Sequence, residues 1–142
     1  MSIQDDNKRI VARFDAILNN RDLSLLDVLC APDMVNHSLA PGRPAGLEGT
    51  RDYLATGGRS WQTEHWRQSY VVAEDDLVVQ FGVRAGHWPG GDFFGYPMPS
   101  GDFTREVAFM YRVTDGRIAE RWAVRDDLGL LHRLGALPAR SG

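Results

Sequence analysis

The sequence has very little of several features that define large protein classes. Only one of the 142 residues, Cys30, is a cysteine, which excludes an internal disulfide and predicts a reducing compartment such as the cytoplasm. No apolar run approaches the roughly 20 residues that a membrane-spanning helix needs. The first six residues, Met-Ser-Ile-Gln-Asp-Asp, are polar and acidic, so we expect neither a signal peptide nor a transit peptide there.

Positive charge and ligand-binding motifs are equally scarce. Sixteen basic residues stand against nineteen acidic ones, a net charge of -3, whereas nucleic-acid-binding domains usually carry a basic excess. All of the basic residues except Lys8 are arginines, and arginine is suited to bidentate contacts with anions. No His, Cys, Asp or Glu cluster has metal-ligand spacing, and no glycine-rich phosphate loop follows a strand. We therefore expect no nucleic-acid partner, no metal and no cofactor.

What is present is the composition of one globular domain spanning residues 1–142. Hydrophobic residues make up 43% and charged residues 25%, both ordinary values. Helical periodicity predicts helices over 5–19, 22–29 and 47–57, the first capped by Asp5 or Asp6. Strand-like patterns cover 34–37, 66–74, 77–86, 103–113 and 117–125. A last short helix follows them, capped by Asp126 or Asp127. Loops rich in Gly and Pro cover 39–46 and 87–102. Helices followed by an antiparallel meander indicate an α+β fold.

The strand over 103–113 shows which side chains face the interior. Its more apolar face carries every second residue: Phe103, Arg105, Val107, Phe109, Tyr111 and Val113. The next strand can pair with it in two registers. A three-residue turn places Ala119, Arg121, Ala123 and Arg125 on the same face, whereas a two-residue turn places Glu120, Trp122 and Val124 there, because a slip by one residue exchanges the faces.

Three segments resemble the SnoaL-like polyketide cyclases, within the nuclear-transport-factor-2-like superfamily. The first is Asp-Met-Val-Asn-His at 33–37, followed by a Gly/Pro loop and a helix. The second is His87 followed by Gly-Asp-Phe-Phe-Gly-Tyr-Pro at 91–97, where family members have a histidine and a Phe-x-Gly-x-Pro-Pro loop. The third and most specific is Asp-Gly-Arg-Ile-Ala-Glu-Arg-Trp-Ala-Val-Arg-Asp at 115–126, leading into Leu-Gly-Leu-Leu-His-Arg-Leu-Gly at 128–135.

The resemblance implies a cone-shaped barrel, a curved and mainly antiparallel sheet closed by the N-terminal helices around a pocket. It also favours the first register of the last hairpin, and it implies a homodimer. The outward side chains of Trp122 and Met110 would suit a sheet-to-sheet dimer face.

The chain departs from the family where the known chemistry is carried out. The cyclases close a ring by an aldol step, which needs a base for an acidic proton and an acid for the new alkoxide. The resemblance assigns this work to an aspartate on the last strand, which aligns here with Ala123. A histidine on the preceding strand of some cyclases aligns with Phe109. Neither alanine nor phenylalanine can transfer a proton.

Other residues are candidates for the missing roles, each with a structural alternative. His37 and His87 lie beside loops and titrate near neutral pH, so either is a candidate base or else a surface imidazole. Asp126 occupies an acidic position common in the family, yet an aspartate that begins a helix is also an ordinary N-cap. We place substrate-binding roles on Asn36, Trp88, Arg105, Phe109, Tyr111, Arg121, Ala123 and Arg125. The arginines would hold a carboxylate, phenolate or enolate, or else pair with acidic neighbours.

Two functional hypotheses follow from these residues. In the first, the protein is an enzyme that transfers a proton next to a carbonyl of a small hydrophobic oxygenated molecule, with cyclisation, isomerisation or dehydration as the outcome. In the second, the same scaffold binds a small ligand without catalysis. The loss of the central aspartate favours the second hypothesis, and the two histidines keep the first one open.

Overall fold

The computed structural model describes residues 2–39, 42–56 and 62–138. Its helices are α1 (Ile3–Asn20), the 3-10 turn η1 (Leu23–Leu25), α2 (Leu26–Leu29), α3 (Gly46–Thr56) and α4 (Asp127–Arg133). Its strands are β1 (Cys30–Asn36), β2 (Gln62–Glu74), β3 (Leu77–Trp88), β4 (Gly91–Phe93), β5 (Tyr96–Met98), β6 (Gly101–Thr114) and β7 (Arg117–Arg125). The predicted α+β class is confirmed.

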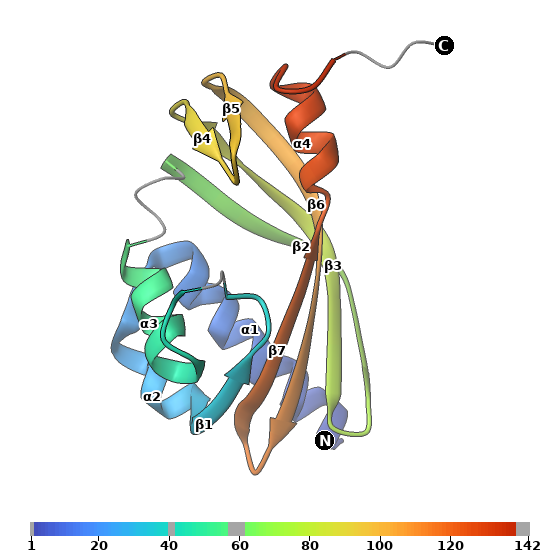
Figure 1. Ribbon diagram of the computed structural model, residues 1–142. Helices are drawn as coiled ribbons and strands as arrows, with labels where there is room; N and C mark the ends of the chain where they lie inside the picture. Colours follow the sequence, from blue (N-terminus) through green and yellow to red (C-terminus); the bar gives the residue numbers. More distant parts are fainter. Residues whose placement is uncertain (1, 40–41, 57–61, 139–142) are drawn as a thin grey trace.

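Five strands form one curved sheet in the order β1-β7-β6-β3-β2. The pairs β2–β3, β3–β6 and β6–β7 are antiparallel, and β1 is parallel to β7. Within the described residues, hydrogen bonds do not close the sheet into a barrel, so it keeps two edges, β1 and β2. Helices α1, α2 and α3 all lie on one side of this sheet (Figure 1).

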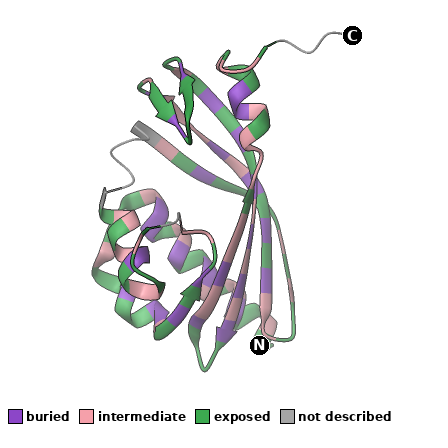
Figure 2. Cartoon of the chain, viewed as in Figure 1, coloured by how far each residue is buried: buried purple, intermediate pink, exposed green. Residues whose placement is uncertain are grey.

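The side chains under these helices form the main core and define what we call the inner face of the sheet. Helix α1 contributes Val11, Phe14 and Ile17, and buried positions alternate along the long strands (Figure 2). The inner face carries Trp66, Val78, Gln80, Phe109, Tyr111 and Arg121. The first helix was expected to be capped by Asp5 or Asp6, but Ser2 is the cap, because its hydroxyl accepts a hydrogen bond from the Asp5 backbone N–H.

The hairpin between β6 and β7 combines features of both registers that the sequence allowed. Its turn has two residues, Asp115 and Gly116, both at positive φ, as in type I′ turns. A β-bulge then follows, because Val113 pairs with Ile118 while Arg112 pairs with Glu120, leaving Ala119 as the extra residue. The bulge reverses the alternation, so that Arg121 pairs with Tyr111 on the inner face. The predicted inner face is correct, although the turn is shorter than that register required.

The second glycine- and proline-rich segment contains more structure than predicted. Residues expected to form only a loop build the small hairpin of β4 and β5. This hairpin belongs to a second core cluster with β6 and α4, made of Trp88, Phe93, Met98, Phe103, Leu130 and Leu131. Among the described residues, no helix is long and apolar enough to cross a membrane.

Candidate functional site

A partly buried carboxyl group, Asp15, lies between α1 and the inner face. Its Oδ2 accepts a hydrogen bond of 2.6 Å from the Gln80 side-chain amide, whose nitrogen also donates to Gln68. Desolvation raises the pKa of Asp15 to about 6, against the opposing effects of Gln80, Trp66 and the positive charge of Arg121. Within the described part of the chain, Asp15 Oδ1 and Gln80 Oε1 are buried without a hydrogen-bond partner. The indole N–H of Trp66 is a buried donor in the same region, and its interaction with Asp15 lowers the pKa of that carboxyl.

The Trp66 side chain forms the wall beside Asp15, and two features fix its position. The Asn19 side chain bonds both the backbone N–H and the backbone C=O of Trp66, at 2.8 and 3.1 Å, tying β2 to the end of α1. Gly82 on β3 lies under the indole, where a Cβ atom would come within 2.7 Å of the ring. Only glycine therefore fits beneath this tryptophan.

Arg121 is the charged group beside this carboxyl. Its guanidinium lies 4.5 Å from the centre of the Phe109 ring, inside an aromatic cage completed by Phe14 and Tyr111. Its Nε donates to the Tyr111 hydroxyl at 3.1 Å. The described residues hold no carboxylate within ion-pair distance of Arg121, so its charge is available to a nearby anion.

A chain of hydrogen bonds from β1 and α3 holds this guanidinium in place. Arg121 donates to the Ser38 hydroxyl at 2.7 Å, and that hydroxyl donates to Asn36 Oδ1 at 2.5 Å. The Asn36 amide in turn donates to Thr50 at 2.8 Å. Asn36, expected to contact substrate, has its amide and its oxygen engaged in this chain and so positions Arg121.

A second charged cluster on the inner face joins β2, β3 and α3. Arg84 and Glu64 form an ion pair of 2.5 Å in which both side chains are less than 10% exposed. The Arg84 side chain also hydrogen-bonds Tyr53 of α3, and its guanidinium lies 5.8 Å from the centre of the Phe109 ring. Burial raises the pKa of the Tyr53 phenol, whereas the positive charges of Arg84 and Arg121 lower it. The charges have the larger effect, so the pKa of Tyr53 lies below its ordinary value.

Two of the predicted arginines lie together next to α4. Arg105 is buried and donates to Asp127 at 2.7 Å, and Arg125 Nε lies 3.7 Å from the other oxygen of that carboxylate. Burial lowers the pKa of Arg105, although Glu64 and Asp127 oppose that effect. The carboxylate of Asp127, shared by both arginines, balances part of their positive charge.

The two candidate histidines lie on the opposite side of the sheet. The His37 ring stacks on the Trp122 ring with 4.9 Å between their centres, and its Nε2 lies 2.7 Å from Glu120 Oε2. Glu120 and Trp122 flank Arg121 in β7, and because Arg121 points inward, their side chains point to the outer face. His87 of β3 pairs with the exposed Asp102 of β6, and the His87 Nδ1 lies 2.9 Å from the Asp102 Oδ1. Neither imidazole contacts Asp15, Arg121 or Arg84.

The other predicted residues have structural contacts. Asp126 is the N-cap of α4, where its carboxylate accepts the Gly129 N–H at 2.9 Å. Trp88 is buried in the second core cluster and donates its indole N–H to the Met98 carbonyl at 2.9 Å. Phe109 and Ala123 are direct partners on β6 and β7. The structure thus brings together Phe109, Tyr111, Arg121 and Ala123 and leaves His37, His87, Asp126 and Trp88 elsewhere.

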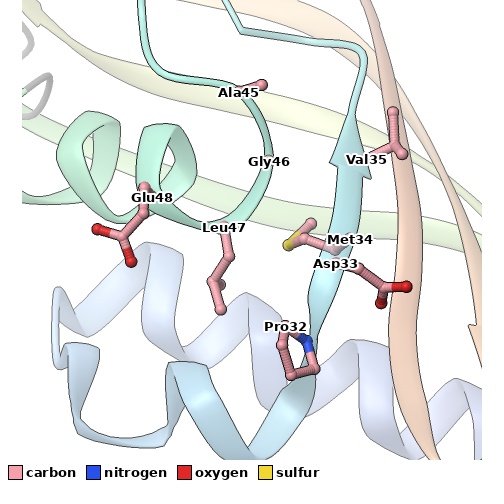
Figure 3. A pocket seen from close by; sticks show the side chains of 8 residues that line it. All are labelled: Pro32, Asp33, Met34, Val35, Ala45, Gly46, Leu47 and Glu48. Atoms are coloured by element: carbon pink, nitrogen blue, oxygen red, sulfur yellow. The ribbon is translucent and has the colours of Figure 1, made fainter.

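An open groove also lies outside this cluster, between β1 and the start of α3 (Figure 3). Its volume is about 500 Å³, and its lining includes Asp33, Met34, Leu47 and Glu48. No group of three or more metal-ligating side chains occurs in the described segments. The groove lacks the converging buried polar groups that distinguish the inner face.

Solved structures share this architecture along nearly the whole chain. TsrD from Streptomyces laurentii superposes with a TM-score of 0.81 at 24% identity, covering 96% of this chain and all of TsrD. IdmH from Streptomyces antibioticus has a TM-score of 0.76 at 30% identity, covering 91% of this chain and 98% of IdmH. A SnoaL-like polyketide cyclase from Agrobacterium tumefaciens has a TM-score of 0.78 at 18% identity, covering 91% of this chain and 98% of that protein.

The sequence comparisons assign the family. A search of curated proteins finds no match. The model of the SnoaL-like polyketide cyclases, in contrast, matches residues 8–134, which include every helix and strand in full except the start of α1. The chain therefore belongs to the SnoaL-like polyketide cyclase family.

Proposed function

We propose that this protein transfers a proton at a carbon next to a carbonyl of a small hydrophobic oxygenated molecule, bound between the helices and the inner face. Cyclisation, isomerisation or dehydration would each begin with such a step. The observation that carries the proposal is the Asp15 carboxyl, partly buried and hydrogen-bonded to Gln80, with a pKa of about 6. A carboxyl of that pKa is ionised at neutral pH and is still basic enough to accept a proton from an activated carbon.

Arg121 supports the second half of this step. Removal of the proton leaves an enolate oxygen, whose negative charge needs a preorganised cation or donor. The Arg121 guanidinium is held by Tyr111, Ser38 and the aromatic cage, and it lies close enough to Asp15 to lower the pKa of that carboxyl. Phe14 and Phe109 supply apolar walls for the remainder of the molecule.

Asp15 offers a base in a chain whose last strand has Ala123 where the resemblance implies an aspartate. We assign no base role to His37 or His87, because each pairs with a carboxylate away from Asp15. The second candidate function is binding without catalysis. The partnership of Phe109 and Ala123, two side chains that cannot move protons, favours that alternative.

Deuterium exchange into a hydrophobic ketone separates the two functions. The protein should accelerate exchange of the α-protons of 2-tetralone in D2O, followed by NMR, with a rate that rises as pH increases through about 6. Asp15→Asn should lower this rate at least about 100-fold, the usual contribution of a general base. Asp33→Asn, which changes an exposed aspartate on β1, is the matched control. Ketone binding without acceleration would support the non-catalytic alternative.

The outer face of the sheet supports a homodimer. Two rows of apolar side chains cross it from β7 to β2 through direct strand partners. One row contains Trp122, Met110, Val79 and Val72, and the other contains Val124, Ala108, Phe81 and Tyr70. Val124, Tyr70 and Val72 are 73%, 71% and 63% exposed. A contiguous apolar surface of this kind marks an interaction site, and a second copy of the chain would cover it with a matching sheet.

A further inference from the structure

We propose that the inner face holds a binding site for a carboxylate anion, in which Arg121 is the cation, and that its ligand is a planar apolar acid. The inference goes beyond the proposed function, because binding of such an acid requires no transfer of a proton from carbon. Both concern the same face of the sheet, and each can fail without the other.

Arg121 is one of three buried arginines in the described part of the chain, and it differs from the other two. Arg84 pairs with Glu64, and Arg105 pairs with Asp127. Arg121 is only 5% exposed, yet no carboxylate of the described residues lies within ion-pair distance of it. A charge taken out of water is costly unless an opposite charge accompanies it. The fold therefore maintains a buried cation without supplying its counter-ion.

The contacts of the Arg121 guanidinium leave one of its nitrogens open to a ligand. Its Nε donates to the Tyr111 hydroxyl at 3.1 Å, and its Nη1 donates to the Ser38 hydroxyl at 2.7 Å. Its Nη2 has no acceptor among the described residues, and it is not one of the fully enclosed polar atoms that lack a partner. Nη2 therefore borders open space, and the two fixed contacts hold it in one orientation.

An ionised carboxylate suits this guanidinium better than other oxygen groups do. A carboxylic acid is already an anion at neutral pH, whereas a phenol must first lose a proton of high pKa. The planar guanidinium matches the two oxygens of a carboxylate, and such bonds are stronger than those between neutral groups. The centres of the Phe109 and Phe14 rings lie 4.5 and 5.6 Å from the guanidinium, so a flat apolar body attached to the carboxylate would meet apolar walls.

The Asp15 carboxyl should respond to a ligand of this kind. Burial raises its pKa to about 6, and the positive charge of Arg121 opposes that rise. Tyr111 of β6 is the other ionisable group that interacts with Asp15, whereas Gln80 of β3 and Trp66 of β2 are uncharged. An anion on Arg121 cancels the effect of the guanidinium and adds a like charge, so the pKa of Asp15 should rise further. Binding should therefore take up a proton near neutral pH.

Calorimetric titration with 2-naphthoate and its neutral isostere 2-naphthamide tests the site. The wild type at pH 6 should bind the acid at least about 10-fold more tightly than the amide, because a charged pair replaces a neutral hydrogen bond. Arg121→Met should abolish this preference and leave the affinity for the amide within about 3-fold of the wild type. Ser38→Ala, which removes one contact and keeps the charge, should lower the preference about 3-fold. Arg13→Met, which removes an exposed arginine of α1, should keep the preference unchanged.

The pH dependence of the same titration shows whether the acid binds beside Asp15. The affinity of the wild type for 2-naphthoate should fall about 10-fold between pH 5.5 and about 8, as a rise of about one unit in the pKa of Asp15 requires. Asp15→Asn should remove this dependence and bind the acid more tightly than the wild type at about pH 8.

The outcomes separate this site from the proposed function. Equal affinity of the wild type for acid and amide, no binding of the acid, or a preference that survives Arg121→Met would overturn the carboxylate site. Binding of the acid without proton uptake would also overturn it, because the anion would then lie away from Asp15. Exchange of 2-tetralone by a wild type without the preference would leave the proposed function standing, and the preference without exchange would leave only the binding site.

Discussion

The partly buried carboxyl of Asp15 should make the stability of this protein depend on pH. The pKa of Asp15 is raised from 3.8 to about 6, so between these values the folded state binds more protons than the unfolded state. The free energy of unfolding should therefore fall as pH rises from about 4 to 6, by at most about 3 kcal/mol from this group. Asp15→Asn removes the buried charge and should be more stable than the wild type at pH 7 by about 1–3 kcal/mol. Urea unfolding at pH 4.5 and 7.5 measures both effects, and equal differences at both pH values would contradict the prediction.

The residues of the candidate site differ in how far the sequence could predict them. Alternation along 103–113 placed Phe109 and Tyr111 on the inner face, because a strand exposes every second side chain to the same side. Asp15 was not predicted, because an acidic residue in an amphipathic helix is usually on the solvated face. Its burial depends on Gln80, 65 residues further along the chain. The same limit applies to Tyr53, which is distinguished only by its contact with Arg84.

Among the elements, the last hairpin shows how a local irregularity decides the chemistry of a surface. The sequence Thr-Asp-Gly predicted the turn, but not the extra residue that follows it. Without the bulge at Ala119, the two-residue turn would place Trp122 and Val124 inside and Arg121 outside. Composition alone does not argue against that register, because it buries two apolar side chains and exposes an arginine. Packing of Arg121 against Phe109 and Tyr111 is what the sequence pattern could not reveal.

Helix α4 provides a prediction at the level of one element. Asp126 caps the helix through the Gly129 N–H, and α4 in turn contributes Leu130 and Leu131 to the second core cluster. Asp126→Ala should lower the free energy of unfolding by about 1 kcal/mol, whereas Asp126→Asn should retain most of it, since asparagine caps nearly as well. Thermal unfolding of both variants measures this difference. Ketone exchange by Asp126→Asn should match the wild type, and a loss of exchange there would reinstate Asp126 as a catalytic candidate.

The neighbouring hairpin of β4 and β5 was predicted only as a loop. Its segment is rich in Gly and Pro, which signal turns, and each strand has only three residues. Its order comes from tertiary packing, since Phe93 and Met98 are buried against Trp88 and α4. Sequence periodicity cannot detect strands this short.

For the whole molecule, the two faces of one sheet differ in what covers them and in their side chains. The helices cover the inner face with its charged clusters, and no helix of the described chain packs on the apolar rows of the outer face (Figure 1). Charged groups lie beside these rows, with Arg112 pairing with Asp76 and Glu120. An apolar centre with polar neighbours is the usual composition of a specific interface.

The dimer prediction follows from this surface. Wild-type protein should sediment at twice the monomer mass at micromolar concentration, because a stable interface needs about 800 Å² from each partner and the two rows span four strands. Val124→Lys together with Val72→Lys places two charges in the interface and should shift the protein to monomer. Both side chains point away from the core, so the variant should remain folded by circular dichroism. Leu128→Lys changes an apolar residue on α4 that is also mostly exposed, and this variant should remain dimeric. A wild type that stays monomeric at 100 micromolar would show that the rows meet some other partner, whereas retention of the dimer in the double variant would place the contact elsewhere.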